Sequence, residues 1–388
     1  MVQVSGFVAS GFESVRDQFH ANFAERGEVG AAVCATVDGE TVVDLWGGLA
    51  DADSGRPWQR DTLVDFYSAG KPLVACLLLQ LVDSGLVGLD DPIASVWPEF
   101  ASGGKEAATI RHALSHQAGV PAIAAPLTNE DLWSWDAMVG ALAATPAWFP
   151  PGSRVVYHTN TYGHLVGGIA HRLTGELPGA LLRRIAGDLG ADVHFGLEDP
   201  DLERCATVIL DSRRSPAAAT IKTGLTGGAA APDEQDGPGR DMVQRGYFNP
   251  PGYSSFGVVN TTSWRRAQIP STNGHGSAAG LAAFYQGLLS PGRVISAALT
   301  AEATRVQAEG DCPVLGERAA FGLGFVPTSP RRRFGPNDGA FGHFGTGGAV
   351  GFADPARGVA FGYVMNHVIP RWQSTRNRAL IDALYTAL

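Results

Sequence analysis

The chain has 388 residues, of which 45% are hydrophobic and 17% charged, and its formal net charge is −9. That length and hydrophobic content are sufficient for a large core and favour two lobes or domains. The acidic balance argues against nucleic acid or an anionic membrane as a partner, because Lys and Arg are scattered apart from short runs such as Arg331-Arg332-Arg333. No apolar run in the sequence reaches the ~18 residues that a membrane span requires.

The cysteines and the N-terminus bear on the cellular compartment. Cys34, Cys76, Cys205 and Cys312 show no CxxC spacing, and the first two lie inside apolar runs. We therefore expect buried thiols, no disulfide framework and a reducing compartment. Residues 1–6 show no basic region followed by an apolar core, so we expect no signal peptide and a cytoplasmic protein.

The first elements along the chain are a helix and a hairpin. Residues 11–25 carry apolar side chains at helical spacing, which predicts an amphipathic helix. Two strand-like runs, 31–37 and 40–46, flank Asp38-Gly39, and this pattern predicts a β-hairpin with a tight turn.

The stretch from residue 65 to residue 79 is a polar turn that runs into an apolar helix. We expect the helix to begin at Ser68, because Pro72 is tolerated only in the first turn. Residues three apart lie on the same helix face, so the Lys71 amine is predicted to reach the Ser68 hydroxyl. The helix N-terminus adds N–H donors and partial positive charge. These features together predict an activated nucleophile, and Gly85 is expected to end the helix.

The rest of the chain is helical in the middle and strand-rich at the end. Helices are expected at residues 110–117, 131–144, 161–173, 280–289 and 376–388, and strands at 321–326, 341–344, 350–353 and 359–365. Between about 212 and 260 the composition shifts to Gly, Ala, Pro and charge, which predicts a long surface segment or insertion.

This order of elements predicts an α+β fold in which both chain ends build one antiparallel sheet flanked by helices. We expect the sheet lobe to contain residues 1–80 and 290–388. Residues 81–289 are expected to form a mainly helical lobe that carries the Gly/Pro-rich insertion around 212–260. A cleft between the lobes is the expected position of a site.

Three widely spaced motifs could meet in that cleft: Ser68-Ala69-Gly70-Lys71, Tyr157-His158-Thr159-Asn160 and His343-Phe344-Gly345. With these motifs, and with supporting stretches at 114–119, 273–276 and 351–366, the chain resembles the serine β-lactamase/penicillin-binding-protein superfamily. It is most similar to the family VIII carboxylesterases and class C β-lactamase-like proteins. That family carries S-x-x-K at the start of a core helix, a Tyr motif on the helical lobe, and K-T-G or H-x-G on a late strand. The resemblance covers most of residues 10–385.

Two of these motifs have competing copies. Ser102-Gly103-Gly104-Lys105 is a second S-x-x-K, but it lies in a glycine-rich loop without an apolar helix, so we favour Ser68. Lys222-Thr223-Gly224 is a literal K-T-G, but no strand pair follows it, so we favour His343.

Metal and classical-triad chemistry are disfavoured. His112 and His116 have i, i+4 spacing, but the glutamate of H-E-x-x-H and a third ligand are missing, so we expect neither metal nor cofactor. The nearest approach to G-x-S-x-G is at residues 252–257, which has one residue too many.

The resemblance implies acyl transfer through a covalent acyl-enzyme on Ser68. Lys71 and Tyr157 would share the proton transfers, with Tyr157 protonating the leaving group. The N–H groups of Ser68 and Thr346 would form the oxyanion hole, and Gly345 would allow close approach of that backbone. Positive charge at Lys71 is expected to lower the pKa of the Tyr157 phenol, so that a tyrosinate could serve as a base.

Two departures from the β-lactamase pattern bear on the substrate. Thr159 stands where Y-x-N has asparagine, and Asn160 comes one residue late. His343 replaces a lysine, and a histidine is mostly neutral at pH 7. Both changes, with the missing signal peptide, favour short-chain neutral esters over β-lactams.

The leading hypothesis is a cytoplasmic serine carboxylesterase acting on a small-molecule ester. Its oligomeric state is left open between monomer and homo-oligomer. The alternatives are a β-lactamase-like amidase or peptidase, an acyltransferase, and a non-catalytic acyl-binding sensor with the same fold.

Overall fold

The computed structural model describes residues 2–210, 238–369 and 373–388. The strands are β1 (Val4–Val8), β2 (Gly30–Val37), β3 (Glu40–Asp51), β4 (Arg56–Pro57), β5 (Val64–Asp65), β6 (Val193–Phe195), β7 (Ile209–Leu210), β8 (Gly274–Gly276), β9 (Ala308–Cys312), β10 (Glu317–Phe321), β11 (Val326–Pro327), β12 (Phe341–Phe344), β13 (Val350–Asp354), β14 (Val359–Met365) and β15 (His367–Val368). The α-helices are α1 (Glu13–Glu25), α2 (Lys71–Asp83), α3 (Ile110–Leu114), α4 (Asn129–Leu132), α5 (Trp135–Ala144), α6 (Thr161–Thr174), α7 (Pro178–Leu189), α8 (Asp199–Glu203), α10 (Pro238–Phe248), α11 (Thr262–Arg266), α12 (Ala278–Leu289), α13 (Ala297–Thr304) and α14 (Thr375–Ala387). The 3-10 turns in the described part of the chain are η1 (Tyr67–Gly70), η2 (Ile93–Ser95) and η3 (Pro98–Ala101).

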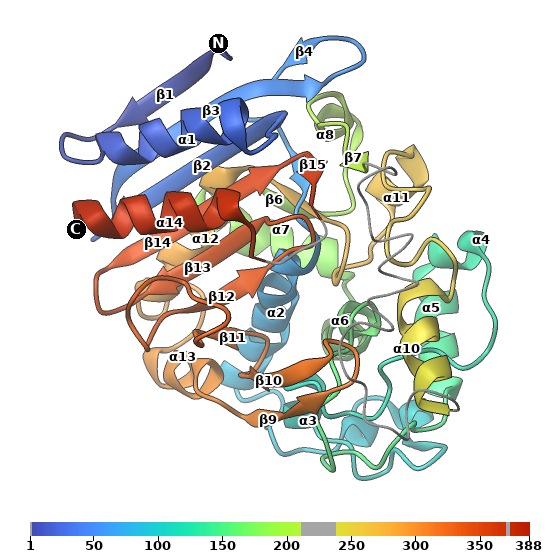
Figure 1. Cartoon of the computed structure of the whole chain (residues 1–388). Coiled ribbons are helices and arrows are strands. Elements are labelled where there is room, and N and C mark those ends of the chain that lie inside the picture. Colours follow the sequence, from blue (N-terminus) through green and yellow to red (C-terminus); the bar gives the residue numbers. More distant parts are fainter. Residues whose placement is uncertain (1, 211–237, 370–372) are drawn as a thin grey trace.

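The central sheet joins the two ends of the chain, as the sequence predicted. Its strand order is β1-β3-β2-β14-β13-β12-β11, with β4 paired to β3, and the pairings are antiparallel. N-terminal β2 lies beside C-terminal β14, with Ala31 opposite Met365 and Val37 opposite Val359 (Figure 1). The β2–β3 turn has positive φ at both Asp38 and Gly39, which is the conformation that favours a two-residue hairpin loop.

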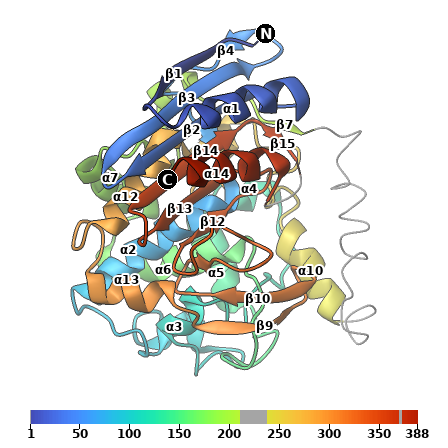
Figure 2. The ribbon, with the colours of Figure 1, turned by 60° about the vertical axis from the view of Figure 1, so that its left-hand side comes forward.

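Helices cover both faces of the sheet. α1 and α14 lie side by side on one face, and α12 lies on the other (Figures 1 and 2). The predicted boundary at residue 289 would assign α12 to the helical lobe, but α12 packs against β14, β2 and β13. The close approach depends on Gly362 in β14, where a Cβ atom would lie 2.2 Å from the Ala278 carbonyl oxygen. α12 therefore packs mainly on the sheet, and it also contacts α7.

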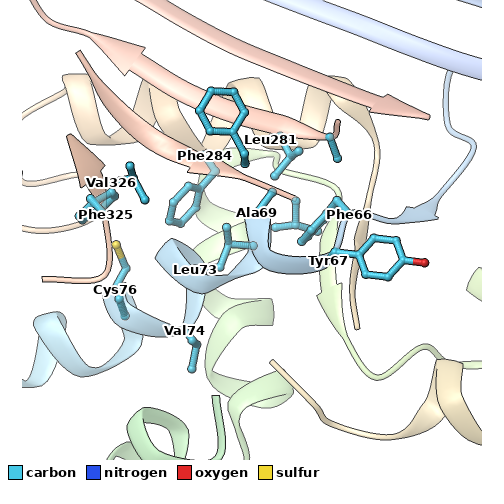
Figure 3. Close-up of a cluster of buried hydrophobic side chains, with 14 of the residues drawn as sticks. Phe66, Tyr67, Ala69, Leu73, Val74, Cys76, Leu281, Phe284, Phe325 and Val326 are labelled. Carbon is cyan, nitrogen blue, oxygen red and sulfur yellow. The ribbon is translucent and has the colours of Figure 1, made fainter. Parts of the chain in front are cut away.

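The start of α2 is fixed by an apolar cluster. Phe66 and Leu73 pack with Leu281 and Phe284 of α12, and all four side chains are buried (Figure 3). Burial of side chains of this size stabilises by roughly 1.5–3 kcal/mol each. Tyr67 points away from this cluster (Figure 3). The cluster connects the first turn of α2 to the sheet through α12.

Several expected elements differ from the structure in their bounds. The helix expected at 110–117 ends at Leu114, and the one expected at 131–144 is divided into α4 and α5 because Ser134 caps α5 by accepting a hydrogen bond from the Ala137 N–H. Of the expected insertion, residues 238–248 form α10, whereas 212–237 lie outside the described residues, as does the K-T-G at Lys222.

The described cysteines and helices agree with two further expectations. Cys34, Cys76, Cys205 and Cys312 are buried free thiols. Among the described residues, no helix combines the length and apolar character needed to cross a membrane.

Candidate active site

Ser68 lies in the single 3-10 turn η1, directly after Tyr67, whose backbone φ is +52°. Positive φ is uncommon for a residue other than glycine. It is held here by Asp65, whose Oδ1 accepts a hydrogen bond from the Tyr67 N–H at 2.8 Å. The α-helix itself begins at Lys71, so the prediction that it begins at Ser68 was wrong by three residues. Side chains three apart eclipse in 3-10 geometry, so Lys71 still projects over Ser68.

The Lys71 side chain is fully buried, and its amine contacts three oxygen atoms. Nζ lies 3.0 Å from Ser68 Oγ, 2.7 Å from the Thr159 carbonyl oxygen and 3.0 Å from the Ser271 carbonyl oxygen. Burial lowers the pKa of the Lys71 amine well below its ordinary value, which favours the neutral form. A neutral amine has two N–H groups and one lone pair. Because carbonyl oxygens only accept, they take the two N–H groups and leave the lone pair for the Ser68 hydroxyl proton.

Tyr157 lies in the segment before α6, with its ring beside the lysine. Lys71 Nζ is 4.8 Å from the centroid of the Tyr157 ring. The ring stacks on Phe321 with a centroid distance of 5.6 Å and on His343 with 6.1 Å. Burial raises the pKa of the Tyr157 phenol, and the neighbouring Ser68 hydroxyl opposes that effect only in part. The expectation of a tyrosinate is therefore corrected: burial favours the protonated phenol, and Lys71 is the better candidate base.

Of the two histidines with i, i+4 spacing, His116 supports this segment. α3 ends at Leu114, so His116 lies beyond the helix that carries His112. His116 is buried, and its Nδ1 accepts a hydrogen bond from the His158 backbone N–H at 3.1 Å. Its ring packs against the Tyr157 ring at 4.9 Å. Among the residues that the structure describes, no group of three or more potential ligands could hold a metal ion.

His343 lies on β12 and is buried beside Tyr157. Its Nδ1 is 2.7 Å from the Phe344 carbonyl oxygen, so this nitrogen carries the proton of the neutral ring. Burial, with a smaller contribution from Lys71, lowers the pKa of His343 to about 3. His343, which the sequence predicts in place of the lysine of K-T-G, is therefore uncharged at neutral pH.

Gly345 brings the end of β12 against the turn that carries Ser68. A Cβ atom at this position would lie 2.1 Å from the Phe66 carbonyl oxygen, so no larger residue fits without displacement. The Gly345 N–H donates to the Ala349 carbonyl oxygen at 2.7 Å and closes a tight turn. Thr346, the residue predicted to contribute an oxyanion-hole N–H, is the next residue in this turn.

The second S-x-x-K does not bring its serine and lysine together. Lys105 is buried, and its Nζ donates to the carbonyl oxygens of Ala143 and Thr145, the former at 3.0 Å. Ser102 is exposed, and its Oγ hydroxyl donates to the Glu99 carbonyl oxygen at 3.4 Å. Ser102 and Lys105 thus each bind other groups, and the choice of Ser68 as the nucleophile stays a prediction.

The near-match to G-x-S-x-G at 252–257 is part of a packed turn. Ser254 Oγ donates to the Tyr247 carbonyl oxygen at 2.7 Å, and Ser255 Oγ lies 3.4 Å from the Tyr67 hydroxyl. Both hydroxyl groups therefore bind neighbouring segments. Their hydrogen-bond partners among the described residues do not include a histidine.

A buried lysine amine against a serine hydroxyl, under a tyrosine and beside the end of a sheet strand, defines a serine hydrolase with a β-lactamase-type fold. The family profile named Beta-lactamase matches residues 15–385. The chain belongs to the Beta-lactamase family.

Individual relatives and solved structures within this fold carry esterase, β-lactamase and penicillin-binding-protein names. The chain is 31% identical to the esterase/beta-lactamase LipL of Mycobacterium tuberculosis over 382 residues, which cover 95% of this chain and 84% of LipL. Among solved structures, it is similar to a family VIII carboxylesterase with a TM-score of 0.88 and 35% identity, with full coverage of both chains. A penicillin-binding protein homolog from Caulobacter crescentus gives a TM-score of 0.87 and 36% identity, again with full coverage. The expected family, fold class and enzyme class, a serine hydrolase of the esterase type, are confirmed.

Proposed function

We propose that the protein is a serine carboxylesterase that hydrolyses short-chain, uncharged esters through an acyl-enzyme on Ser68. The observation that carries the proposal is the Lys71 amine, which is buried between Ser68 Oγ and two backbone carbonyl oxygens. A neutral amine fixed in this way can remove the serine proton without a separate activating base. The esterase names of its relatives support the same activity.

Acylation begins when the Ser68 hydroxyl gives its proton to the Lys71 lone pair and Oγ bonds to the ester carbonyl carbon. The carbonyl electron pair moves onto oxygen, where the N–H groups of Ser68 and Thr346 would stabilise the negative charge by about 3 kcal/mol each. When the intermediate collapses, the C–O bond to the alcohol breaks. The Tyr157 phenol protonates the departing oxygen and regains a proton from the Lys71 ammonium group. Water then attacks the acyl-enzyme by the reverse sequence of proton transfers and releases the acid.

The polarity of the site favours uncharged substrates. His343 is neutral, since burial lowers its pKa to about 3, so this position supplies no fixed positive charge for a carboxylate of the substrate. Thr159 faces Lys71 with its carbonyl oxygen instead of an asparagine amide. β-Lactam hydrolysis is the second candidate, because LipL is named as both esterase and β-lactamase. Cytoplasmic location and homo-oligomerisation stay predictions from the sequence.

Parallel assays with p-nitrophenyl acetate, p-nitrophenyl butyrate and nitrocefin test the proposal. We expect turnover of both esters, with kcat/KM for nitrocefin at least about tenfold lower, because a neutral His343 does not bind the β-lactam carboxylate by charge. Turnover of nitrocefin without ester turnover would overturn the esterase assignment. A single stoichiometric acylation without turnover would instead identify an acyl-binding sensor.

The pH dependence of kcat/KM is expected to follow Lys71. The base must be deprotonated, and the pKa of Lys71 lies well below the ordinary lysine value of about 10.4. Activity should therefore be present at neutral pH and fall as the pH decreases through the lowered pKa. The Tyr157 phenol stays protonated beyond the ordinary tyrosine value of about 10, so no alkaline loss from this group is expected below that pH. A profile of kcat/KM between pH 5 and 10 checks both the acid limb and the absence of an alkaline loss. A rise of kcat/KM only near pH 10 would show that the pKa of Lys71 is not lowered.

A further inference from the structure

Asn160 is a buried asparagine whose side chain joins three segments around the site. Its Nδ2 donates to the Gly246 carbonyl oxygen at 2.8 Å and to Ser254 Oγ at 2.7 Å. Its Oδ1 accepts a hydrogen bond from Thr272 Oγ1 at 2.8 Å. Among the contacts of the described residues, these groups bind the amide, and Lys71 is bound instead by Ser68 Oγ and the carbonyl oxygens of Thr159 and Ser271.

The residues next to these contacts are the ones that hold the lysine. Thr159 precedes Asn160, and Ser271 precedes Thr272. The carbonyl oxygens of Thr159 and Ser271 are the two backbone acceptors of the Lys71 amine. The single hydrogen bond between Asn160 and Thr272 thus links the two acceptors one residue away from each.

The Ser271 side of this link is packed tightly against α6. The Gly163 N–H donates to Ser271 Oγ. A Cβ atom at position 163 would lie 2.5 Å from the Ser271 backbone nitrogen. Asn160 immediately precedes α6, so the start of that helix carries both contacts with the 271–272 segment.

We propose that Asn160 is a positioning residue for the lysine base: it fixes the spacing of the Thr159 and Ser271 carbonyl oxygens and thereby directs the Lys71 lone pair at Ser68. The inference rests on the proposed role of Lys71 in the esterase mechanism. When the spacing is fixed, both amine N–H groups are bound and one orientation of the lone pair remains. When it is not, the amine can rotate, and water can reach it through the loosened contact.

The test compares Asn160→Ala with Asn249→Ala. Asn249 is also buried and also holds the 246–254 region, through hydrogen bonds to the carbonyl oxygens of Ile123 and Ala125 at 2.8 and 2.7 Å. Its hydrogen bonds do not involve the 159–160 or 271–272 residues. It therefore controls for loosening of the 246–254 segment alone.

The readout is the rate at which a fluorophosphonate probe labels Ser68 between pH 5 and 10. In labelling, Oγ bonds to phosphorus, fluoride leaves, and the hydroxyl proton passes to Lys71. Asn160→Ala is expected to slow labelling at neutral pH by about tenfold or more and to move the acid limb to higher pH, since admitted water raises the lysine pKa. Asn249→Ala is expected to keep the parent acid limb.

A second variant keeps the proposal testable if Asn160→Ala does not fold. Thr272→Val replaces the hydroxyl that donates to Asn160 Oδ1 with a methyl group, and it should shift the acid limb in the same direction by a smaller amount. An unshifted limb in both folded variants, or the same shift in Asn249→Ala, would overturn the proposal. Because labelling needs no ester turnover, a labelled but esterase-inactive protein would contradict the proposed function and not this role of Asn160.

Discussion

Ser68→Ala is expected to lower kcat/KM for p-nitrophenyl butyrate by at least about three orders of magnitude, because removal of the nucleophile of a covalent mechanism leaves only binding and oxyanion stabilisation. The variant should fold like the parent, since the hydroxyl group is small and lies in η1, just before α2. Steady-state kinetics with a thermal unfolding curve for each protein measure both expectations.

Ser102→Ala is the matched control for the serine. Both serines belong to an S-x-x-K sequence, but Ser102 is exposed and its lysine is bound to the carbonyl oxygens of Ala143 and Thr145. Its kcat/KM should stay near the parent value. If Ser102→Ala were inactive and Ser68→Ala active, the assignment of the nucleophile would be wrong.

Lys71→Met is expected to reduce kcat/KM by about two to four orders of magnitude, which is the usual contribution of a positioned general base. Methionine has a similar length and no proton acceptor comparable to an amine. The loss should appear in kcat, because the amine acts on the serine proton and not on the bound ester. The measurement is the pair kcat and KM at a pH on the plateau of the parent profile.

Lys105→Met controls for removal of a buried lysine. Like Lys71, Lys105 is buried and donates to two backbone carbonyl oxygens, so the two substitutions leave comparable unsatisfied acceptors. Lys105 has no serine hydroxyl among these partners. Both variants should therefore lose similar stability, and only Lys71→Met should lose activity. If Lys71→Met and Lys105→Met had the same kcat/KM, the role of Lys71 as the base would be wrong.

Local patterns in the sequence were sufficient for the part of the site that lies within one turn. The three-residue spacing of Ser68 and Lys71 predicts their contact because both α and 3-10 geometry place such residues on one face. The hairpin of β2 and β3 was predicted in the same way, from two strand-like runs around Asp38-Gly39. The order of the elements predicted that strands from the two chain ends share one sheet. No pattern of residues predicted that β2 pairs with β14 in particular.

The contacts that tune the chemistry could not be read from the sequence. The Ser271 carbonyl oxygen lies 200 residues away from Lys71, and every residue type carries a carbonyl group, so no side-chain pattern marks it. The pKa of Tyr157 was expected to fall because of a charged Lys71. The structure buries both groups under rings from distant elements, so burial favours the neutral forms of both.

For Asn160, the sequence showed an unusual position but not the contacts of the side chain. Its position one residue late was visible in the sequence and indicated a weakened Y-x-N motif. The structure shows that its amide is bound to residues from 246, 254 and 272. Thr159 contributes its backbone carbonyl oxygen to Lys71, at the position where the Y-x-N pattern has an asparagine.

The central claim is that Ser68 is the residue that becomes acylated, and the most direct measurement is the site of fluorophosphonate labelling. Intact-protein mass spectrometry gives the number of labels, and fragmentation of the peptide that contains Ser68 gives the residue. Fragmentation is needed because trypsin does not cut between Lys71 and Pro72, so Ser68 and Ser102 fall on one peptide. We predict one label per chain, on Ser68, and none in Lys71→Met over the same time. A label on Ser102 or on any other serine would contradict the proposed mechanism.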